Sequence, residues 1–453
     1  MPTLAKSARL FADLVFIGGG LLCLAVLGFV LLHHDRLLTS PMRAAFFLGL
    51  PVAGGAACVV GMRLAPALRV SLAVSLFAAV FALYAFEVLM TFRPRAVDAA
   101  PTADFDPRTK YEVVRDLRRQ GVMAYPSVFP QYLMQTSLKG TLHSPLRLDG
   151  AEFLPLSGIP GVRTVLCNES GAYVLFDADE LGFANPRGLW PGEGGVDIAA
   201  VGDSFTQGYC VQPEASFIGL IRGRHPKTLS LGMSGNGPLL ELAGLKEFLP
   251  ERRPRIVLWF FYEGNDIPGD LDIERRSPLL MRYLEPGFRQ AGRPAEAGGL
   301  LVRHVEDLIA SGDGRRETDA GIVQTLTSIT GLSRVRSLLR LPSTSADRPD
   351  YALFRAILAE ADRTVKAWNG CLAFVYLPQR DTGATSELVS LHDGVRRVVE
   401  GLGLPFIDGV RALRAHPDPL TLFPRGRHNH YNEAGHRLMA ETVLNALESG
   451  MCR

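Results

Sequence analysis

The stretch Val196-Asp-Ile-Ala-Ala-Val-Gly-Asp-Ser-Phe-Thr-Gln-Gly208 sets a short apolar run directly ahead of a turn that carries one serine. The run from Ile198 to Val201 contains no polar residue, which is typical of a strand covered on both faces. The following Gly-Asp-Ser has the composition of a turn. A strand that ends in such a turn before a helix presents a side chain at the carboxyl edge of a sheet, where open α/β folds bind ligands. Ser204 is therefore either a nucleophile or the cap of the following helix.

Three later stretches favour the nucleophile. Leu229-Ser-Leu-Gly-Met-Ser-Gly-Asn-Gly-Pro238 predicts a strand that ends in small residues, whose N–H groups an anion can approach closely. Arg255-Ile-Val-Leu-Trp-Phe-Phe-Tyr262 predicts a central strand that runs into Glu263-Gly-Asn-Asp266, at the same edge of the sheet. His428-Asn-His-Tyr-Asn-Glu-Ala-Gly-His436 opens a predicted helix. These stretches supply a base and anion-binding groups for the serine.

The four blocks together resemble the motifs of the SGNH (GDSL-like) family of serine esterases and acyltransferases. The resemblance implies that Ser204 is the nucleophile and that His430 is the base. It also implies an oxyanion hole made of the backbone N–H groups of Ser204 and Gly235 and the side chain of Asn265. A minor departure is Glu263, which stands where the family usually has Gly.

A larger departure concerns the acid of the triad. The family places an Asp two or three residues ahead of the His, where this chain has His428 and Arg427. The nearest carboxylates in the sequence, Asp418 and Glu433, lack the family spacing. A free imidazole can accept a proton at neutral pH unaided. We therefore predict that His430 works without a sequence-adjacent carboxylate, with a main-chain carbonyl as one possible partner of its other ring nitrogen.

Strand and helix patterns alternate after Val196, which predicts an α/β fold with a parallel sheet and helices on both faces. The resemblance covers roughly residues 196–447 and implies a flavodoxin-like sheet. The expected strands are Val196–Val201, Thr228–Leu231, Arg255–Tyr262, Cys371–Leu377 and Pro405–Ile407. The expected helices are Ala215–Arg224, Leu239–Leu249, Tyr351–Trp368, Ser386–Leu402 and Asn432–Leu447.

Two segments flank or interrupt this domain, which we place at residues 196–453. We expect residues 96–195 to form a tether and a strand-rich collar, and their Asp179-Glu-Leu-Gly-Phe-Ala-Asn-Pro186 resembles a segment of bacterial SGNH proteins linked to exopolysaccharide. We expect that segment to pack against the sheet edge, with substrate lining as the alternative. An insert at about 270–350 contains two short amphipathic pieces, Leu300–Ile309 and Val335–Leu341, which are compatible with a solvated face, a membrane-surface helix or a lid.

The first 95 residues predict a membrane anchor. Leu14–Leu32 and Ala44–Met62 carry no charge, and Val70–Phe92 carries only Glu87, for which we expect an interfacial position. Each run is long enough to cross a hydrocarbon core of about 30 Å. Four basic residues flank the spans on each side, so the distribution of charge leaves the orientation open. The family resemblance implies a bacterial inner-membrane protein with the hydrolase domain outside the cytoplasm.

The composition excludes some classes of function. A length of 453 residues exceeds what one core normally holds, and a net charge of +2 argues against nucleic acid as a partner. His428, His430 and His436 make a poor zinc set, and we expect neither a metal nor a cofactor. Four cysteines outside the predicted spans permit disulfides without specifying pairs: Cys167, Cys210, Cys371 and Cys452.

The sequence therefore predicts a membrane-anchored serine esterase or O-acyltransferase. Its substrates would be acyl esters, above all acetyl esters, of carbohydrate or cell-envelope polysaccharide, and this substrate class comes from the resemblance alone. The residues leave open whether water or a sugar hydroxyl takes the acyl group, and they leave the oligomeric state open. The alternative is a catalytically inactive SGNH-like protein that binds glycans or assists assembly, and the missing Asp is its only support.

Overall fold

The computed structural model describes residues 2–32, 34, 41–92, 105–137, 140–190, 195–290, 294–310, 329–332, 335, 349–380, 386–424 and 430–452. These residues fall into two compact units. One comprises Ala100–Asp313 and Pro349–Arg453, and the other comprises Met1–Ala99 and Gly314–Arg348.

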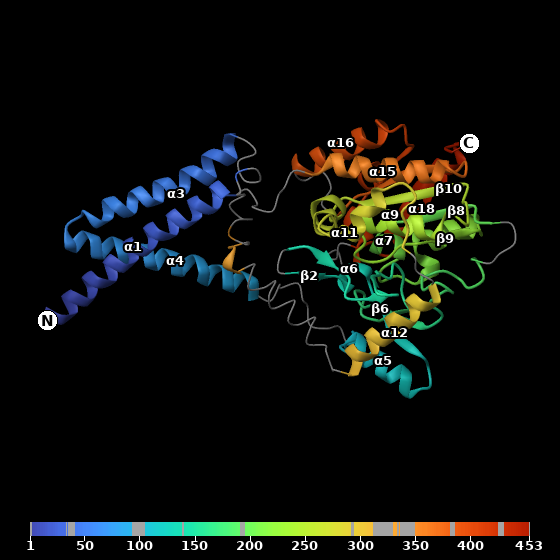
Figure 1. The fold of residues 1–453 in the computed structure, drawn as a ribbon, viewed down its shortest axis with the longest axis horizontal. Helices are drawn as coiled ribbons and strands as arrows, with labels where there is room; N and C mark the ends of the chain where they lie inside the picture. Colours follow the sequence, from blue (N-terminus) through green and yellow to red (C-terminus); the bar gives the residue numbers. More distant parts are fainter. Residues whose placement is uncertain are drawn as a thin grey trace. The chain divides into compact units, whose positions relative to one another are not determined.

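A five-stranded parallel sheet forms the centre of the larger unit (Figure 1). Its strands are β8 (Ile198–Val201), β9 (Thr228–Ser230), β10 (Ile256–Tyr262), β11 (Cys371–Leu377) and β12 (Phe406–Asp408). They lie in the order β12-β11-β10-β8-β9, with every neighbouring pair parallel. Counted along the chain this is the flavodoxin-like order 2-1-3-4-5 read from the other edge. The predicted fold class is confirmed.

Helices cover both faces of this sheet, because its central strands are apolar throughout. Every residue of β10 is buried, and alternate side chains enter two separate hydrophobic clusters. The cluster around Trp259 is completed by α9 (Pro238–Phe248), α15 (Tyr351–Lys366) and α16 (Ser386–Glu400). The cluster around Phe260 is completed by α8 (Phe217–Arg224), α17 (Gly409–Ala415) and α18 (Glu433–Glu448). The expected helices are therefore present, and their ends agree with the expected ones to within two residues.

The collar is rich in short strands and shares a hydrophobic core with the sheet. Its three-stranded sheet contains β1 (Ala124–Pro126), β6 (Arg163–Cys167) and β7 (Val174–Asp177), in the order β1-β6-β7. Two helices accompany it, α5 (Lys110–Arg119) and α6 (Pro130–Leu133). Four two-residue strands pair as β2 (Gln135–Thr136) with β3 (Leu142–His143) and β4 (Arg147–Leu148) with β5 (Ala151–Glu152).

Residues 179–186 pack against the edge strand of the parallel sheet, as expected. The buried carboxylate of Asp179 accepts hydrogen bonds from Phe183 N at 2.9 Å, Asn185 Nδ2 at 2.8 Å and Trp190 Nε1 at 2.7 Å. The Asn185 amide then pairs with the backbone of Ser230 in β9, accepting at 2.8 Å and donating at 2.9 Å. Asn185 thus occupies an edge that would otherwise leave backbone groups unpaired.

The first part of the insert packs on the collar. It contains α10 (Asp272–Glu274), α11 (Pro278–Met281) and α12 (Pro294–Ala310). Leu301 and Val305 of α12 are buried, and Glu306 forms an ion pair with Arg118 of α5 at 2.9 Å. Protein therefore covers the apolar side of this amphipathic helix. The second amphipathic piece, residues 335–341, lies outside the described residues except for Val335.

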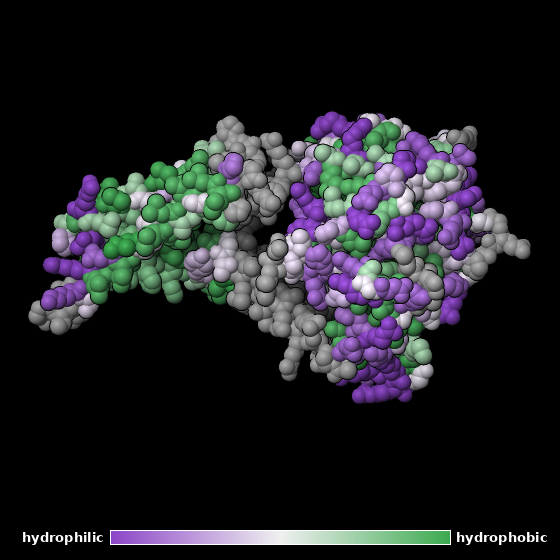
Figure 2. Space-filling view, viewed as in Figure 1, coloured by the Kyte–Doolittle hydropathy of each residue, from purple (hydrophilic) through white to green (hydrophobic). Residues whose placement is uncertain are grey.

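The smaller unit contains three helices that are long and apolar enough to cross a membrane: α1 (Pro2–Leu32), α3 (Pro41–Met62) and α4 (Pro66–Phe92). Their outer surfaces are largely apolar (Figure 2). A Cβ on Gly54 would lie 3.0 Å from Cys23 Sγ, so α1 and α3 pack at close range through a small residue. Membrane anchoring fits these properties.

Glu87 of α4 has a partner that the sequence did not indicate. Its side chain is fully buried, and Oε2 accepts a hydrogen bond of 2.9 Å from the backbone N–H of Val335. Both residues belong to the smaller unit. Part of the insert therefore packs with the anchor helices and satisfies a carboxylate on one of them.

The four cysteines of the larger unit form two disulfides, Cys167–Cys210 and Cys371–Cys452. Their Cα atoms lie 5.4 Å and 5.6 Å apart. The first joins collar strand β6 to the loop that follows the serine turn. Cys23 and Cys58, on the anchor helices, are free.

Candidate active site

Ser204 is the first residue of the short helix α7 (Ser204–Gln207), directly after β8 and its Gly-Asp turn. The cap of this helix is Asp203, whose Oδ1 accepts a hydrogen bond of 2.9 Å from Phe205 N. Because Asp203 occupies the capping position, the Ser204 hydroxyl is not needed there. The alternative that Ser204 is only a helix cap is wrong.

His430 meets the serine from the other end of the chain. Its Nε2 lies 2.9 Å from Ser204 Oγ, although the two residues are 226 positions apart. The imidazole ring packs near Phe205 and Tyr209, with ring centroids 5.1 Å and 4.6 Å away. Asn432 caps the following helix α18 and thereby fixes where the loop carrying His430 ends.

The other ring nitrogen of His430 faces a carboxylate. Its Nδ1 lies 2.8 Å from Glu169 Oε1, and 261 positions separate the two residues. Glu169 belongs to the collar, in the turn between β6 and β7. Among the described residues, neither Asp418 nor Glu433 contacts His430. That the histidine works without a sequence-adjacent carboxylate stays a prediction. The partner is nevertheless a carboxylate and not a main-chain carbonyl, because the collar folds back onto the sheet edge.

Three neighbouring strands bring the remaining expected residues to this edge. Asn265 follows β10, Ser204 follows β8 and Gly235 follows β9, and these strands are adjacent in the order β10-β8-β9. Gly235 has φ +78°, in the left-handed region that favours glycine. A Cβ there would also lie 3.2 Å from Gln131 Oε1 of α6, so the collar closes over this loop.

Two side chains hold the Gly235 loop in place. Gln207 Oε1 accepts from Ser234 N at 3.0 Å and from Ser234 Oγ at 2.6 Å, which ties the loop to α7. Glu274 of α10 accepts from Gly237 N at 2.6 Å and from Leu239 N at 2.8 Å, at the start of α9. The insert therefore supplies the acceptor for N–H groups that the N-terminus of α9 leaves unpaired.

The side chain of Asn265 is oriented by a carboxyl group. Its Nδ2 donates to Asp270 Oδ2 at 2.7 Å, and Gln131 Nε2 donates to Asp270 Oδ1 at 3.0 Å. Burial raises the pKa of Asp270 to about 7, although the hydrogen bond from Gln131 opposes the shift. Burial likewise raises the pKa of Asp203 to about 6, against the hydrogen bond from Phe205 N and the charge of His430. Asp203 and Asp270 thus belong to a group of buried carboxyl groups next to the serine turn.

Glu241 of α9 belongs to this group and makes a pH-dependent contribution to stability. It is 2% exposed, and neither carboxylate oxygen has a hydrogen-bond partner in the described part of the chain. Burial, followed by the charges of Asp203, Glu274 and Asp270, raises its pKa well above 4.5. The folded protein therefore keeps a proton that the unfolded chain releases above pH 4.5, so the contribution of Glu241 to stability falls as pH rises.

We expect Glu241→Gln to remove this dependence, because an amide does not ionise. Below about pH 4 the free energies of unfolding of variant and wild type should differ by a constant. Above about pH 4 the free energy of unfolding of the variant should rise relative to that of the wild type by up to about 1.4 kcal/mol per pH unit. This rise should end where the pH passes the raised pKa of Glu241. Denaturant titrations of the detergent-solubilised protein at several pH values measure this. Glu433→Gln, at an exposed site, is the matched control. A difference that does not change with pH would contradict the prediction.

Two residues that the sequence singled out have structural contacts. Glu263, the departure from the family glycine, is buried and accepts from Tyr376 Oη and Gln379 N, both at 2.8 Å. His436 is buried and accepts a hydrogen bond of 3.2 Å from Phe217 N, as expected for a packing residue. His428 lies outside the described residues. In the part of the chain that the structure describes, no group of three His, Cys, Asp or Glu side chains could hold a metal ion.

Glu169 is the site residue that sequence reasoning missed. The only signal was its place in Asn168-Glu-Ser-Gly171, a polar turn directly after Cys167. Pairing Cys167 with Cys210 would have placed this turn beside the serine loop. Four cysteines allow three connectivities, so the sequence could not select that pair.

Comparison with family models and with curated proteins gives no match. Among solved structures the chain is similar to the lipase/acylhydrolase from Enterococcus faecalis, with 13% identity, a TM-score of 0.31 and coverage of 56% of this chain and 96% of that one. It is also similar to a GDSL-like lipase from Bacteroides thetaiotaomicron VPI-5482, with 10% identity, a TM-score of 0.32 and coverage of 56% and 88%. A third is the acetyl xylan esterase AlAXEase, with 12% identity, a TM-score of 0.31 and coverage of 56% and 100%. Because these values are low, the fold class rests on the strand order of the sheet.

Proposed function

We propose that this protein is a serine-dependent enzyme that cleaves or transfers acyl esters through an acyl-Ser204 intermediate. The observation that carries the proposal is the chain of contacts Ser204 Oγ to His430 Nε2 at 2.9 Å and His430 Nδ1 to Glu169 Oε1 at 2.8 Å. A nucleophile in contact with a base, which in turn contacts an orienting carboxylate, is the arrangement that acyl transfer by a serine requires.

Each residue has a defined step in this mechanism. With its Nδ1–H donated to Glu169, His430 presents a lone pair on Nε2 and takes the hydroxyl proton as Ser204 Oγ attacks the ester carbonyl. The backbone N–H groups of Ser204 and Gly235 and the amide of Asn265 stabilise the tetrahedral oxyanion. His430 then returns the proton to the departing alkoxide, which leaves the acyl group on Ser204. Water or a sugar hydroxyl next attacks that ester, and His430 again accepts the proton. His430 passes this proton to Ser204 Oγ as the bond between Oγ and the acyl carbon breaks, which releases the acid or the new ester and restores the serine.

The alternative function, an inactive protein that binds glycans or assists assembly, depends on a missing acid. Glu169 lies at the position where a triad needs its carboxylate, which favours the enzyme. Labelling with a fluorophosphonate probe tests the proposal, since the probe reacts only with an activated serine. We expect the wild-type protein to label and Ser204→Ala to remain unlabelled. Absence of labelling in both proteins would favour the binding function.

We further propose that the substrates are acyl esters of carbohydrate, a class that the motif resemblance suggests. An exposed aromatic side chain beside the Gly235 loop supports this substrate class. Tyr132 of α6 is 75% exposed and packs edge-on against Phe129, with centroids 5.8 Å apart. A Cβ on Gly235 would lie 3.7 Å from Tyr132 Cε2. A fixed aromatic face at this place can contact the apolar face of a sugar ring.

Tyr132→Ala should therefore raise KM for an acetylated oligosaccharide by about fivefold, because it removes an aromatic contact worth about 1 kcal/mol. Turnover of a small aryl acetate should change little, since that substrate does not reach the tyrosine. Tyr132→Phe keeps the ring and is the matched control. An equal loss on both substrates would show that Tyr132 supports the site structurally instead.

The catalytic unit is proposed to lie outside the cytoplasm. Both disulfides lie in this unit, and disulfides persist in oxidising compartments, whereas both cysteines of the anchor helices are free. Three spans place the two ends of the chain on opposite sides of the membrane. Alkaline phosphatase fused after Arg453 should therefore be active, and a fluorescent protein that folds only in the cytoplasm should be dark there. The reverse pattern would place the catalytic unit in the cytoplasm.

A further inference from the structure

The position of Glu169 is set by its backbone and not by partners of its carboxylate. Oε1 contacts His430, and Oε2 is buried without a hydrogen-bond partner in the described part of the chain. No arginine or backbone N–H among these residues steers the carboxylate. Its direction toward His430 therefore depends on the turn 168–171 that carries it.

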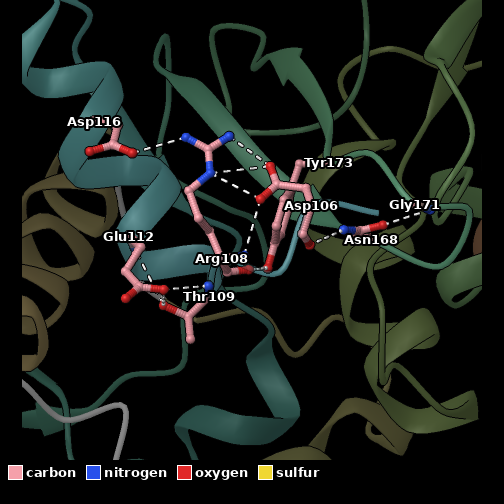
Figure 3. Close-up of polar contacts among 8 residues, drawn as sticks. All are labelled: Asp106, Arg108, Thr109, Glu112, Asp116, Asn168, Gly171 and Tyr173. Atoms are coloured by element: carbon pink, nitrogen blue, oxygen red, sulfur yellow. Dashed lines mark hydrogen bonds and ion pairs between the residues drawn. The ribbon is translucent and has the colours of Figure 1, made fainter. Parts of the chain in front are cut away.

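The segment that enters the catalytic unit from the membrane anchor holds this turn (Figure 3). The described chain resumes at Phe105, and the next residue, Asp106, forms two hydrogen bonds with the turn. Its N–H donates to Gly171 O at 2.7 Å, and its carbonyl accepts from Asn168 Nδ2 at 3.0 Å. The two hydrogen bonds therefore hold Asn168 and Gly171, the residues on either side of Glu169 and Ser170.

Asn168 links the hydrogen bonding of Asp106 to the turn itself. Its Oδ1 accepts from Gly171 N at 2.8 Å, so one amide side chain closes the turn and binds the incoming segment at the same time (Figure 3). A side chain that accepts from a backbone N–H a few residues ahead is a standard way of fixing a turn. The two functions of the amide use different atoms and can be separated by mutation.

Arg108 extends the contact along the segment. Its guanidinium donates to the Asp106 carboxylate at 2.6 Å and to Asp116 of α5 at 2.9 Å, and its carbonyl accepts from Tyr173 Oη at 2.8 Å (Figure 3). These side-chain pairs are partly exposed, so each contributes little alone. Together they fix the course of the segment past the turn on the side of β7.

The other side of the turn is fixed covalently. Cys167 is the residue before Asn168, and its disulfide partner Cys210 follows Tyr209, whose ring packs on His430. The turn that carries Glu169 is thus tied on one side to the serine and histidine loops. On the other side it is tied to the segment arriving from the anchor.

We propose that Asn168 and the backbone of Asp106 are positioning residues for Glu169, so that the triad is complete only when the segment leaving the membrane anchor is docked on the turn. The inference rests on the proposed function, because it assigns Glu169 the role of the acid. It makes the residues between anchor and enzyme part of the machinery that orients His430, beyond their role as a link.

Asn168→Asp separates the two bonds of the amide. The new carboxylate can still accept from Gly171 N, but it cannot donate to Asp106 and would face the carbonyl oxygen there. In the full-length protein in detergent, we expect kcat on an aryl acetate to fall about tenfold with KM unchanged. Asn168→Ala should lose at least as much, and its lack of new charge controls for a direct electrostatic effect on the histidine.

The deciding measurement is a double-mutant cycle with Glu169→Gln. If Asn168 acts through Glu169, either Asn168 variant should cause no further loss of kcat in the Glu169→Gln background. Asp177→Asn is the matched control, because its pair with Arg163 at 2.9 Å lies at the far end of the same hairpin. It should leave kcat unchanged, and melting temperatures show that all variants remain folded.

Three outcomes would overturn the inference. Losses that multiply in the double variants would show that Asn168 acts independently of Glu169. A wild-type kcat for both Asn168 variants would show that the docked segment does not position the acid. If Glu169→Gln itself retains wild-type kcat while Ser204→Ala is inactive, the role of the acid fails and the serine mechanism stands. Failure of the proposed function would differ from all three, since Ser204→Ala would then be as active as the wild type.

Discussion

Ser204→Ala is expected to abolish ester turnover, with a loss of kcat of about 10⁴-fold or more, as in enzymes where the nucleophile of a triad is removed. The attacking oxygen would be absent, while the oxyanion donors and the substrate contacts would remain. His430→Ala should show a comparable loss, because Ser204 Oγ has its proton acceptor at 2.9 Å on that imidazole. Steady-state hydrolysis of an aryl acetate by the full-length protein measures both.

The double variant provides an internal check. Residues that act as one unit give strongly non-additive effects, so Ser204→Ala with His430→Ala should be no slower than Ser204→Ala alone. Ser449→Ala is the control for a serine at the C-terminal end of α18, where its hydroxyl donates to Ala446 O at 2.7 Å. Substantial turnover by Ser204→Ala would place the reaction elsewhere in the protein.

Glu169→Gln should lower kcat by about 10⁴-fold, the loss that disabling the orienting acid causes in the serine-protease template. The amide has nearly the same shape, but it lacks the negative charge and offers an N–H that can favour the wrong tautomer of His430. Asp418→Asn and Glu433→Gln should each lose less than about tenfold, because neither residue contacts His430 among the described groups. kcat measured across pH separates a change of mechanism from a shift in titration.

Glu169→Asp sharpens this prediction. It keeps the charge and withdraws the carboxylate by one methylene, so its kcat should lie between those of the wild type and Glu169→Gln. The contrary result would be a full-sized loss at Asp418 or Glu433 together with near wild-type kcat for Glu169→Gln. His430 would then work with that residue as its acid and not with Glu169.

The sequence by itself determined the features that depend on local pattern. Apolar runs such as Arg255–Tyr262 and the periodic helices between them predicted the parallel sheet, because burial on both faces imposes an uninterrupted apolar strand. The grouping of the residues at the strand ends was also predictable. Carboxyl ends of neighbouring parallel strands share one edge, so Ser204, Gly235 and Asn265 were expected together. The three apolar helices followed from length and composition.

The tertiary structure alone decided the partners that come from distant parts of the chain. Glu169 lies 261 positions from His430, and no periodicity or spacing relates a collar turn to a C-terminal loop. The contact exists because collar and sheet share one hydrophobic core and because Cys167 pairs with Cys210, one of several pairings the sequence allowed. The same holds for Glu274 at the start of α9. Local sequence encodes which groups stand at the edge, whereas three-dimensional packing selects which carboxylate reaches them.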